Sequence, residues 1–172
     1  MNRAHLLAAA LAAGSLCAMS AFAIAQTGTP DVVGQMGLKP GRWHTVVRFT
    51  AVTFNPVSGQ TVPADLEAKI RSQLARPVET DDCIGAKRPP NDGLILPGIS
   101  IGSDCALSDV VADRHDLKLR ADCGGFVIIN VKATHTEVAM TADTETFAFP
   151  AGAPFTLNVT ATSKSSYVGE CR

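Results

Sequence analysis

Apolar and polar residues alternate along most of the second half of the chain. Between residues 117 and 123, apolar side chains alternate with charged ones, and this period of two predicts a half-buried strand. Residues 155–162 alternate in the same way between apolar residues and Thr or Asn. We expect strands at 105–111, 117–123, 126–134, 138–147 and 155–162. Short turns between them, including Gly124-Gly125, predict an antiparallel meander.

The first half of the chain predicts one long strand and one helix. Residues from Trp43 to Phe54 are rich in Val, Thr and Phe, and we expect one face to carry Trp43, Val47, Phe49 and Ala51. From Ala64 to Arg76, Leu66, Ile70 and Leu74 recur at every fourth position. They form the stripe of a short amphipathic helix that Pro77 ends.

The segment 85–104 is dominated by Gly, Pro, Asn, Asp and Ser and predicts a loop. We expect Leu94-Ile95-Leu96 to enter the core from this loop as an apolar finger. The predicted fold class is mostly β (α+β). The sheet is a curved antiparallel meander folded partly around one short amphipathic helix, or a small open barrel.

The N-terminus has the pattern of a secretory signal peptide. Arg3 precedes an apolar run from Leu6 to Phe22, and Ala23-Ile24-Ala25 is a small-x-small cleavage motif. Cleavage after about Ala25 is expected, with Ala21-Phe22-Ala23 as a second site. Cys17 is not expected to carry lipid, because the apolar and small residues before it stand in the wrong order.

Removal of residues 1–25 leaves a flexible N-terminal segment, 26–36, and a single β-rich domain, 37–172. The whole chain has 15 basic and 16 acidic residues, a formal net charge of −1, and no basic run. This charge pattern argues against nucleic acid as a partner. No second apolar stretch is long enough to span a membrane, so an exported, periplasmic protein is expected.

Four cysteines remain after the leader: Cys83, Cys105, Cys123 and Cys171. An even number in an exported chain predicts two disulfides. A zinc site is not expected, because no two of them form a close pair. Three pairings are formally possible. We favour Cys83 with Cys105, which closes the middle segment, and Cys123 with Cys171, which ties a strand to the chain end.

The order of these motifs resembles a known family. Lys39-Pro40-Gly41-Arg42-Trp43 opens a strand, Cys83 and Cys105 follow, a later strand ends in Cys123-Gly124-Gly125, and Gly169-Glu170-Cys171 nearly closes the chain. The chain in this respect resembles the bacterial exported domain-of-unknown-function family numbered 3617, over about residues 37–172. It departs from that family by lacking a Met- and Gly-rich turn after the first strand and by carrying the helical insert. The resemblance implies an envelope location and supports the disulfides, and it implies no activity.

One motif predicts hydrolytic chemistry. Gly98-Ile99-Ser100-Ile101-Gly102 matches the G-x-S-x-G nucleophile elbow, with Asp113 or Asp116 and His115 or His135 following in hydrolase order. The elbow requires a strand-to-helix turn above a parallel sheet, whereas Pro97 precedes this motif and no helical pattern follows it. We therefore expect no catalytic residues and no enzyme activity, with a small serine hydrolase using Ser100 as a remote alternative.

The other chemistry-bearing residues have ordinary structural interpretations. His44, His115 and His135 show no metal-ligand spacing and are expected at the surface. Asp81 and Asp82 are a candidate carboxylate pair for acid–base chemistry or calcium, but adjacent side chains on an extended segment point to opposite faces, so a shared role is not expected. Trp43 is expected in the core. No metal or other cofactor is implied.

The favoured function is a non-catalytic module that binds a small apolar or lipid-like molecule on the concave face of the curved sheet. The expected lining residues are Val47, Phe49, Phe126, Ile128 and Leu157. Alternatively, the helix stripe fills this face and leaves no site. A further alternative is a structural or protein-interaction module of the envelope that contacts its partner through the loop 85–104.

Overall fold

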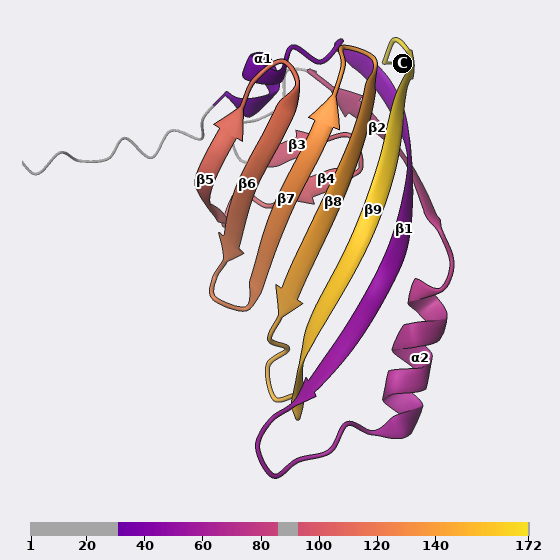
Figure 1. Cartoon of the computed structure of the whole chain (residues 1–172), viewed down its shortest axis with the longest axis vertical. Helices are drawn as coiled ribbons and strands as arrows, with labels where there is room; N and C mark the ends of the chain where they lie inside the picture. Colours follow the sequence, from indigo (N-terminus) through magenta and orange to yellow (C-terminus); the bar gives the residue numbers. More distant parts are fainter. Residues whose placement is uncertain (1–30, 86–92, 172) are drawn as a thin grey trace, which may run out of the picture.

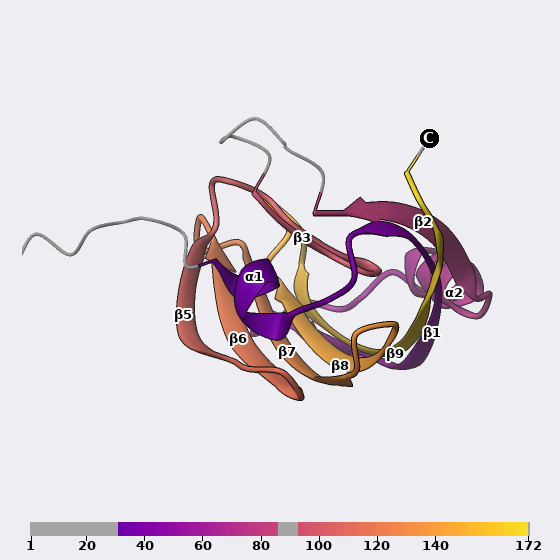
Figure 2. The ribbon, with the colours of Figure 1, turned by 90° about the horizontal axis from the view of Figure 1, so that it is seen from above.

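The computed structural model describes residues 31–85 and 93–171. Seven strands form one antiparallel sheet in the order β2-β1-β9-β8-β7-β6-β5. The strands are β1 (Gly41–Pro56), β2 (Val78–Ile84), β5 (Ala106–Ala112), β6 (Asp116–Cys123), β7 (Val127–His135), β8 (Ala139–Ala148) and β9 (Phe155–Gly169). Figures 1 and 2 show a strongly curved sheet whose edge strands, β2 and β5, do not meet. The predicted mostly β, antiparallel class is confirmed, and the sheet is open.

The meander predicted for the second half of the chain is confirmed. From β5 to β9 each strand pairs with the next in sequence. The β6–β7 pairing places Cys123 opposite Val127, so the Gly124-Gly125 turn lies where the sequence predicts it. The long strand β1 then pairs with the last strand, β9, across most of their lengths. This pairing brings the two ends of the domain together.

Two short elements fill one half of the concave face. The strands β3 (Leu94–Leu96) and β4 (Ile99–Ile101) form a hairpin, and α1 (Val32–Met36) lies on the concave side of the sheet (Figure 2). Leu96 and Ile101 of the hairpin are fully buried, as are Val32 and Met36 of α1. The apolar finger predicted at 94–96 is thus confirmed, within a hairpin rather than a loop.

The segment 26–36, predicted to be flexible, is corrected for its described part. Asp31 Oδ1 accepts a hydrogen bond from Gly34 N and caps α1, and Gly37 ends the helix in a left-handed conformation. The buried side chains of Val32 and Met36 anchor this turn of helix in the core. The sequence pattern missed it because five residues are too few for a helical stripe. The predicted signal peptide lies outside the described residues.

The predicted amphipathic helix is present as α2 (Ala64–Leu74), but the sheet does not fold around it. It packs beside β1 at the sheet edge (Figure 1), and none of its residues is fully buried. Arg71 Nη1 donates to the carbonyl oxygen of Val52, on the part of β1 that β2 does not reach. The helix therefore covers an exposed strand edge instead of filling the concave face.

Trp43 and its neighbours form the centre of the core. Its indole is fully buried, Nε1 donates to the Lys39 carbonyl at 3.0 Å, and the ring meets Tyr167 edge-on at 6.3 Å. The core position predicted for Trp43 is confirmed. The neighbouring residue His44 points to the opposite face of β1, as strand alternation requires.

The two predicted disulfides are present, but the favoured pairing is wrong. The bonds join Cys83 to Cys171 and Cys105 to Cys123. The register explains both. In the β5–β6 hairpin Ala106 stands opposite Asp122, so Cys105 meets Cys123. At the other edge, Arg42 of β1 pairs with Cys83 on one side and with Gly169 on the other, which brings Cys171 near Cys83.

Candidate functional site: the open half of the concave face

The two faces of the sheet differ sharply in charge. Side chains that point to the concave face from β1, β6, β7, β8 and β9 include no Asp, Glu, Lys or Arg. The charged residues of these strands, such as Arg48, Lys132 and Asp143, point to the convex face. A face without charge can pack against apolar material without a large desolvation cost.

Half of this uncharged face is not covered by the hairpin or by α1. We call it the open face and define it by half-buried residues of four strands. They are Val47, Phe49, Val52 and Phe54 of β1; Val127 and Ile129 of β7; Thr144 and Thr146 of β8; and Leu157 and Val159 of β9. The register places them in cross-strand rows, such as Val52–Val159–Thr146–Ile129. The result is a continuous apolar surface broken only by threonines.

A bulge in β1 keeps the apolar residues on this face. Phe49 pairs with Ala161 and Ala51 with Thr160, so Thr50 and Ala51 together oppose one residue of β9. The Thr50 hydroxyl bonds the Thr160 hydroxyl at 2.9 Å on the convex side. Because the bulge shifts the alternation, Val52 and Phe54 return to the concave face, whereas Ala51, predicted to share the face of Trp43, is exposed.

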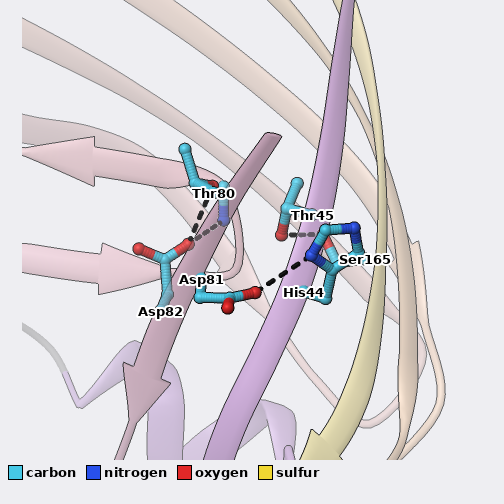
Figure 3. A network of polar contacts seen from close by, with 7 residues as sticks. His44, Thr45, Thr80, Asp81, Asp82 and Ser165 are labelled. Carbon is cyan, nitrogen blue, oxygen red and sulfur yellow. Dashed lines mark hydrogen bonds and ion pairs between the residues drawn. The ribbon is translucent and has the colours of Figure 1, made fainter. Parts of the chain in front are cut away.

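A network of polar contacts fixes the hairpin against the sheet and so sets the boundary of the open face (Figure 3). Asp82 Oδ2 accepts a hydrogen bond from Gly98 N at 2.8 Å and another from the Thr80 hydroxyl at 3.4 Å. Thr45 Oγ1 donates to Ser165 Oγ, which donates to the carbonyl of Pro97. Both ends of the Pro97-Gly98 turn are therefore held by side chains of the sheet.

Aromatic side chains mark the far end of the open face. Phe54 and Phe155 meet edge-on with ring centroids 5.5 Å apart. The Arg71 guanidinium of α2 lies over the Phe54 ring and also bonds Glu67 in the same helix. This ion pair stands at the β1 edge, so it borders the open face at one corner.

Three of the five predicted lining residues lie on the open face, and two do not. Val47, Phe49 and Leu157 are correctly placed. Ile128 points to the convex face, since its neighbour Ile129 packs against the core. Phe126 lies in the β6–β7 turn and is largely exposed. The two errors come from one source, because a strand start placed at Phe126 does not tell which alternate residues turn inward.

The G-x-S-x-G segment has a different geometry from a nucleophile elbow. Ser100 lies in β4, opposite Ile95 of an antiparallel hairpin, and its side chain is exposed. His135 is buried at the end of β7, with Nε2 3.1 Å from the carbonyl oxygen of Asp113. Within residues 31–85 and 93–171, no hydrogen bond joins Ser100 to a histidine.

The predicted acid and base residues meet one another without Ser100. The β5–β6 turn carries Asp113, His115 and Asp116, and His135 N donates to the carbonyl of His115. Asp113 Oδ1 accepts hydrogen bonds from the backbone N–H groups of His115 and Asp116. These bonds hold the pKa of the Asp113 carboxyl below its ordinary value of 3.8. Asp113, His115 and Asp116 therefore stabilise the turn between β5 and β6.

The remaining candidates are on separate faces, as predicted for Asp81 and Asp82. Asp81 Oδ1 lies 2.9 Å from His44 Nδ1 on the convex face, whereas Asp82 bonds the hairpin on the concave side (Figure 3). Ser166 stands opposite His44 on the other neighbouring strand. In the described part of the chain, no hydrogen bond links the Ser166 hydroxyl to the imidazole.

A cleft of about 890 Å³ lies at the opposite end of the sheet from the Phe54–Phe155 pair, beside α1. Asp31, Lys39 and Glu137 contribute to its lining together with Leu94 and Val138. Gly85 and Gly93 also line it. Because its lining carries both signs of charge, whereas the open face is uncharged, the open face is the better candidate for an apolar ligand.

Among residues 31–85 and 93–171, no three His, Cys, Asp or Glu side chains form a cluster that could hold a metal ion. No helix within 31–85 and 93–171 is long and apolar enough to cross a membrane. The two disulfides fit a protein exported to an oxidising compartment.

Comparison with known proteins returned no match to a protein-family model, to a curated protein or to a solved structure.

Proposed function

We propose that this protein is a non-catalytic binding module for a single-chain lipid-like molecule, which lies along the open face. The observation that carries the proposal is the uncharged apolar surface that continues over four strands beside a filled half of the same face. Covering half-exposed apolar side chains with an acyl chain is favourable at about 25 cal/mol per Å². The curvature favours a flexible chain over a flat partner.

The few polar groups of the open face suit an apolar ligand that makes few hydrogen bonds. Thr144 Oγ1 already donates to the Ala161 carbonyl. Thr146 contributes a methyl and a hydroxyl to the next row, opposite Val159. Such a surface accepts a hydrocarbon chain and makes few directional bonds, so it would select by length and shape rather than by headgroup.

We also propose that the protein is periplasmic, that the leader is cleaved after about Ala25, and that the chain belongs to the exported family numbered 3617. The leader pattern and the ordered cysteine motifs support these assignments. Sequencing the N-terminus of protein isolated from the periplasm tests the cleavage site directly.

The two alternatives to a binding module have less support. The interaction module was expected to use loop 85–104, but residues 94–101 form a hairpin whose apolar residues are in the core. The hydrolase requires that a histidine activates Ser100. Within the described residues, no hydrogen bond joins Ser100 to a histidine. Labelling by a fluorophosphonate that is lost in Ser100→Ala would revive the hydrolase.

The test of binding uses protein purified from periplasm without refolding and a fluorescent acyl probe, dansyl-undecanoic acid. Native mass spectrometry first shows whether a lipid co-purifies, and delipidated protein is then titrated with the probe. We expect saturable binding with a blue-shifted emission. Val159→Asp places a charge in the central row of the open face and should abolish this binding.

Two variants control for folding and for charge. Thr162→Asp places the same charge on the same strand but on the convex face, between Arg48 and Asp143, and should leave probe binding unchanged. Val159→Trp keeps the site apolar, fills it with bulk and should also block the probe. The proposal fails if wild-type protein does not bind, or if the folded Val159→Asp and Val159→Trp variants bind as wild type does.

A further inference from the structure

Three loops meet at the end of the sheet where the open face terminates. They are the β1–α2 loop (57–63), the β6–β7 turn (124–126) and the β8–β9 loop (149–154). Backbone hydrogen bonds connect them: Phe149 N donates to the Phe126 carbonyl at 2.7 Å, and Val57 N to the Pro154 carbonyl at 2.9 Å. The three loops therefore form one surface, which we call the loop end.

The loop end exposes large apolar side chains. Phe126 is 60% exposed, Val57 45% and Phe149 40%. These side chains belong to turns, whereas the core is filled by strands and by α1. Exposed aromatic residues gathered at one end of a molecule mark an interaction surface rather than packing.

The three loops of the loop end are also free of charged residues. None of them contains an Asp, Glu, Lys, Arg or His residue. The opposite end of the sheet differs, because its turns carry Lys39, Asp113, Arg114, His115 and Glu137. Acidic residues border the loop end without belonging to its loops: Asp122 Oδ1 accepts a hydrogen bond from Gly125 N at 2.8 Å, and α2 carries Asp65 and Glu67. The loops that hold the exposed phenylalanines are thus themselves uncharged.

We propose that the loop end docks on the surface of a lipid bilayer, with Phe126 and Phe149 inserted at the interface. Aromatic side chains partition to the boundary between headgroups and acyl chains, and uncharged loops enter that region at low cost. Arginine is enriched at protein–protein interfaces, and the three loops contain none. The proposal rests on the proposed function, because docking here places the end of the open face at its source of lipid.

The experiment is flotation of the purified protein with vesicles of phosphatidylcholine alone and of phosphatidylcholine with phosphatidylglycerol. We expect the same partitioning into both and little change between low and high salt, because apolar insertion is not screened. The double variant Phe126→Ser/Phe149→Ser should have a vesicle partition coefficient lower than that of the wild type by a factor of about ten or more. It should bind dansyl-undecanoic acid as wild type does, since neither residue lies on the open face.

The matched control removes equally exposed apolar side chains from elsewhere. Val111 is 56% exposed and Val168 44%, both near the charged end, and Val111→Ser/Val168→Ser should float as wild type does.

Equal loss in both double variants, or no flotation of the wild type, overturns the docking proposal. Flotation only with the anionic lipid and only at low salt also overturns it. Self-association that is lost with the phenylalanines would assign the loop end to a second copy instead. Retained docking with no probe binding would refute the lipid site alone.

Discussion

Replacing Gly98 by alanine tests how closely the hairpin turn approaches the sheet, which is the contact that divides the filled half of the concave face from the open half. Gly98 has a φ of +72°, in the left-handed region that disfavours side chains. A Cβ built on it would overlap Cγ2 of Thr45 on β1. The substitution therefore adds a backbone penalty and a steric one.

The two penalties can be separated with a matched variant. Gly125, in the β6–β7 turn, has a nearly equal φ of +74°, and no atom lies within 4 Å of the position of its added Cβ. Gly125→Ala should therefore cost only the left-handed penalty, about 1–2 kcal/mol. Gly98→Ala should cost this amount plus about 1–3 kcal/mol for overpacking against Thr45. In both variants alanine also restricts the unfolded chain more than glycine does. This effect stabilises the fold by about 0.4–1 kcal/mol and offsets part of the loss equally in the two variants.

Urea unfolding with both disulfides oxidised measures these differences, provided that the slope with denaturant stays the same. A third variant locates the clash. Thr45→Ser removes Cγ2 but keeps the hydroxyl that bonds Ser165, and it leaves Cβ and Oγ1 of residue 45 at 3.1 and 3.3 Å from the added Cβ. In this background the extra cost of Gly98→Ala over Gly125→Ala should therefore be largely lost. Equal losses for Gly98→Ala and Gly125→Ala in the wild-type background would refute the close approach.

Two other predictions follow from the disulfides and from the β5–β6 turn. The Cys83–Cys171 bond closes a separation of 88 residues and the Cys105–Cys123 bond one of 18, so the chain-entropy model gives losses of about 4.6 and about 3 kcal/mol. Urea unfolding of the two double Cys→Ser variants should show this order, and the reverse order would contradict the entropic account. The lowered pKa of Asp113 stabilises the fold above the ordinary value of 3.8, and this contribution is lost as the pH falls through the folded value. Stability measured from about pH 5 to pH 2 should therefore fall less steeply in Asp113→Asn, and an unchanged slope would show that the turn does not depend on the ionised carboxyl.

The sequence predicted best those elements whose partners are neighbours along the chain. The strands β5 to β9 each pair with the next, and their alternation places β5 to β8 within one residue of their true bounds. The last strand, predicted at 155–162, begins as predicted at Phe155 but continues to Gly169. The Gly124-Gly125 turn predicted one of their connections. In this region the alternation of apolar and polar residues is enough to predict the strands, because each strand pairs with its neighbour in sequence.

Apart from the phase of the strand at Phe126 and Ile128, the errors arose where distant segments meet. The disulfide pairing depends on β1 lying between β2 and β9, and β2 has no clear alternation of its own, since it reads Val-Glu-Thr-Asp-Asp-Cys-Ile. The position of α2 was missed because its apolar stripe does not tell whether a helix enters a concave face or covers a strand edge. The contact that decides it, from Arg71 to the Val52 carbonyl, joins a side chain to a backbone group that no sequence pattern marks.

The open face itself follows from a difference in length between the outer strands of the sheet and the elements that cover its concave side. No local sequence pattern marks this difference. The strands β1 and β9 have 16 and 15 residues, whereas β6 has 8 and each strand of the inner hairpin has 3. The hairpin and α1 are long enough to cover the concave face around Trp43, but not the far halves of β1 and β9. Alternation nevertheless continues through Val159 and Leu157 of β9, so apolar side chains keep pointing inward where they are only partly covered. If covering the core were the only requirement, polar residues there would serve as well, and the persistence of the apolar pattern argues for a ligand.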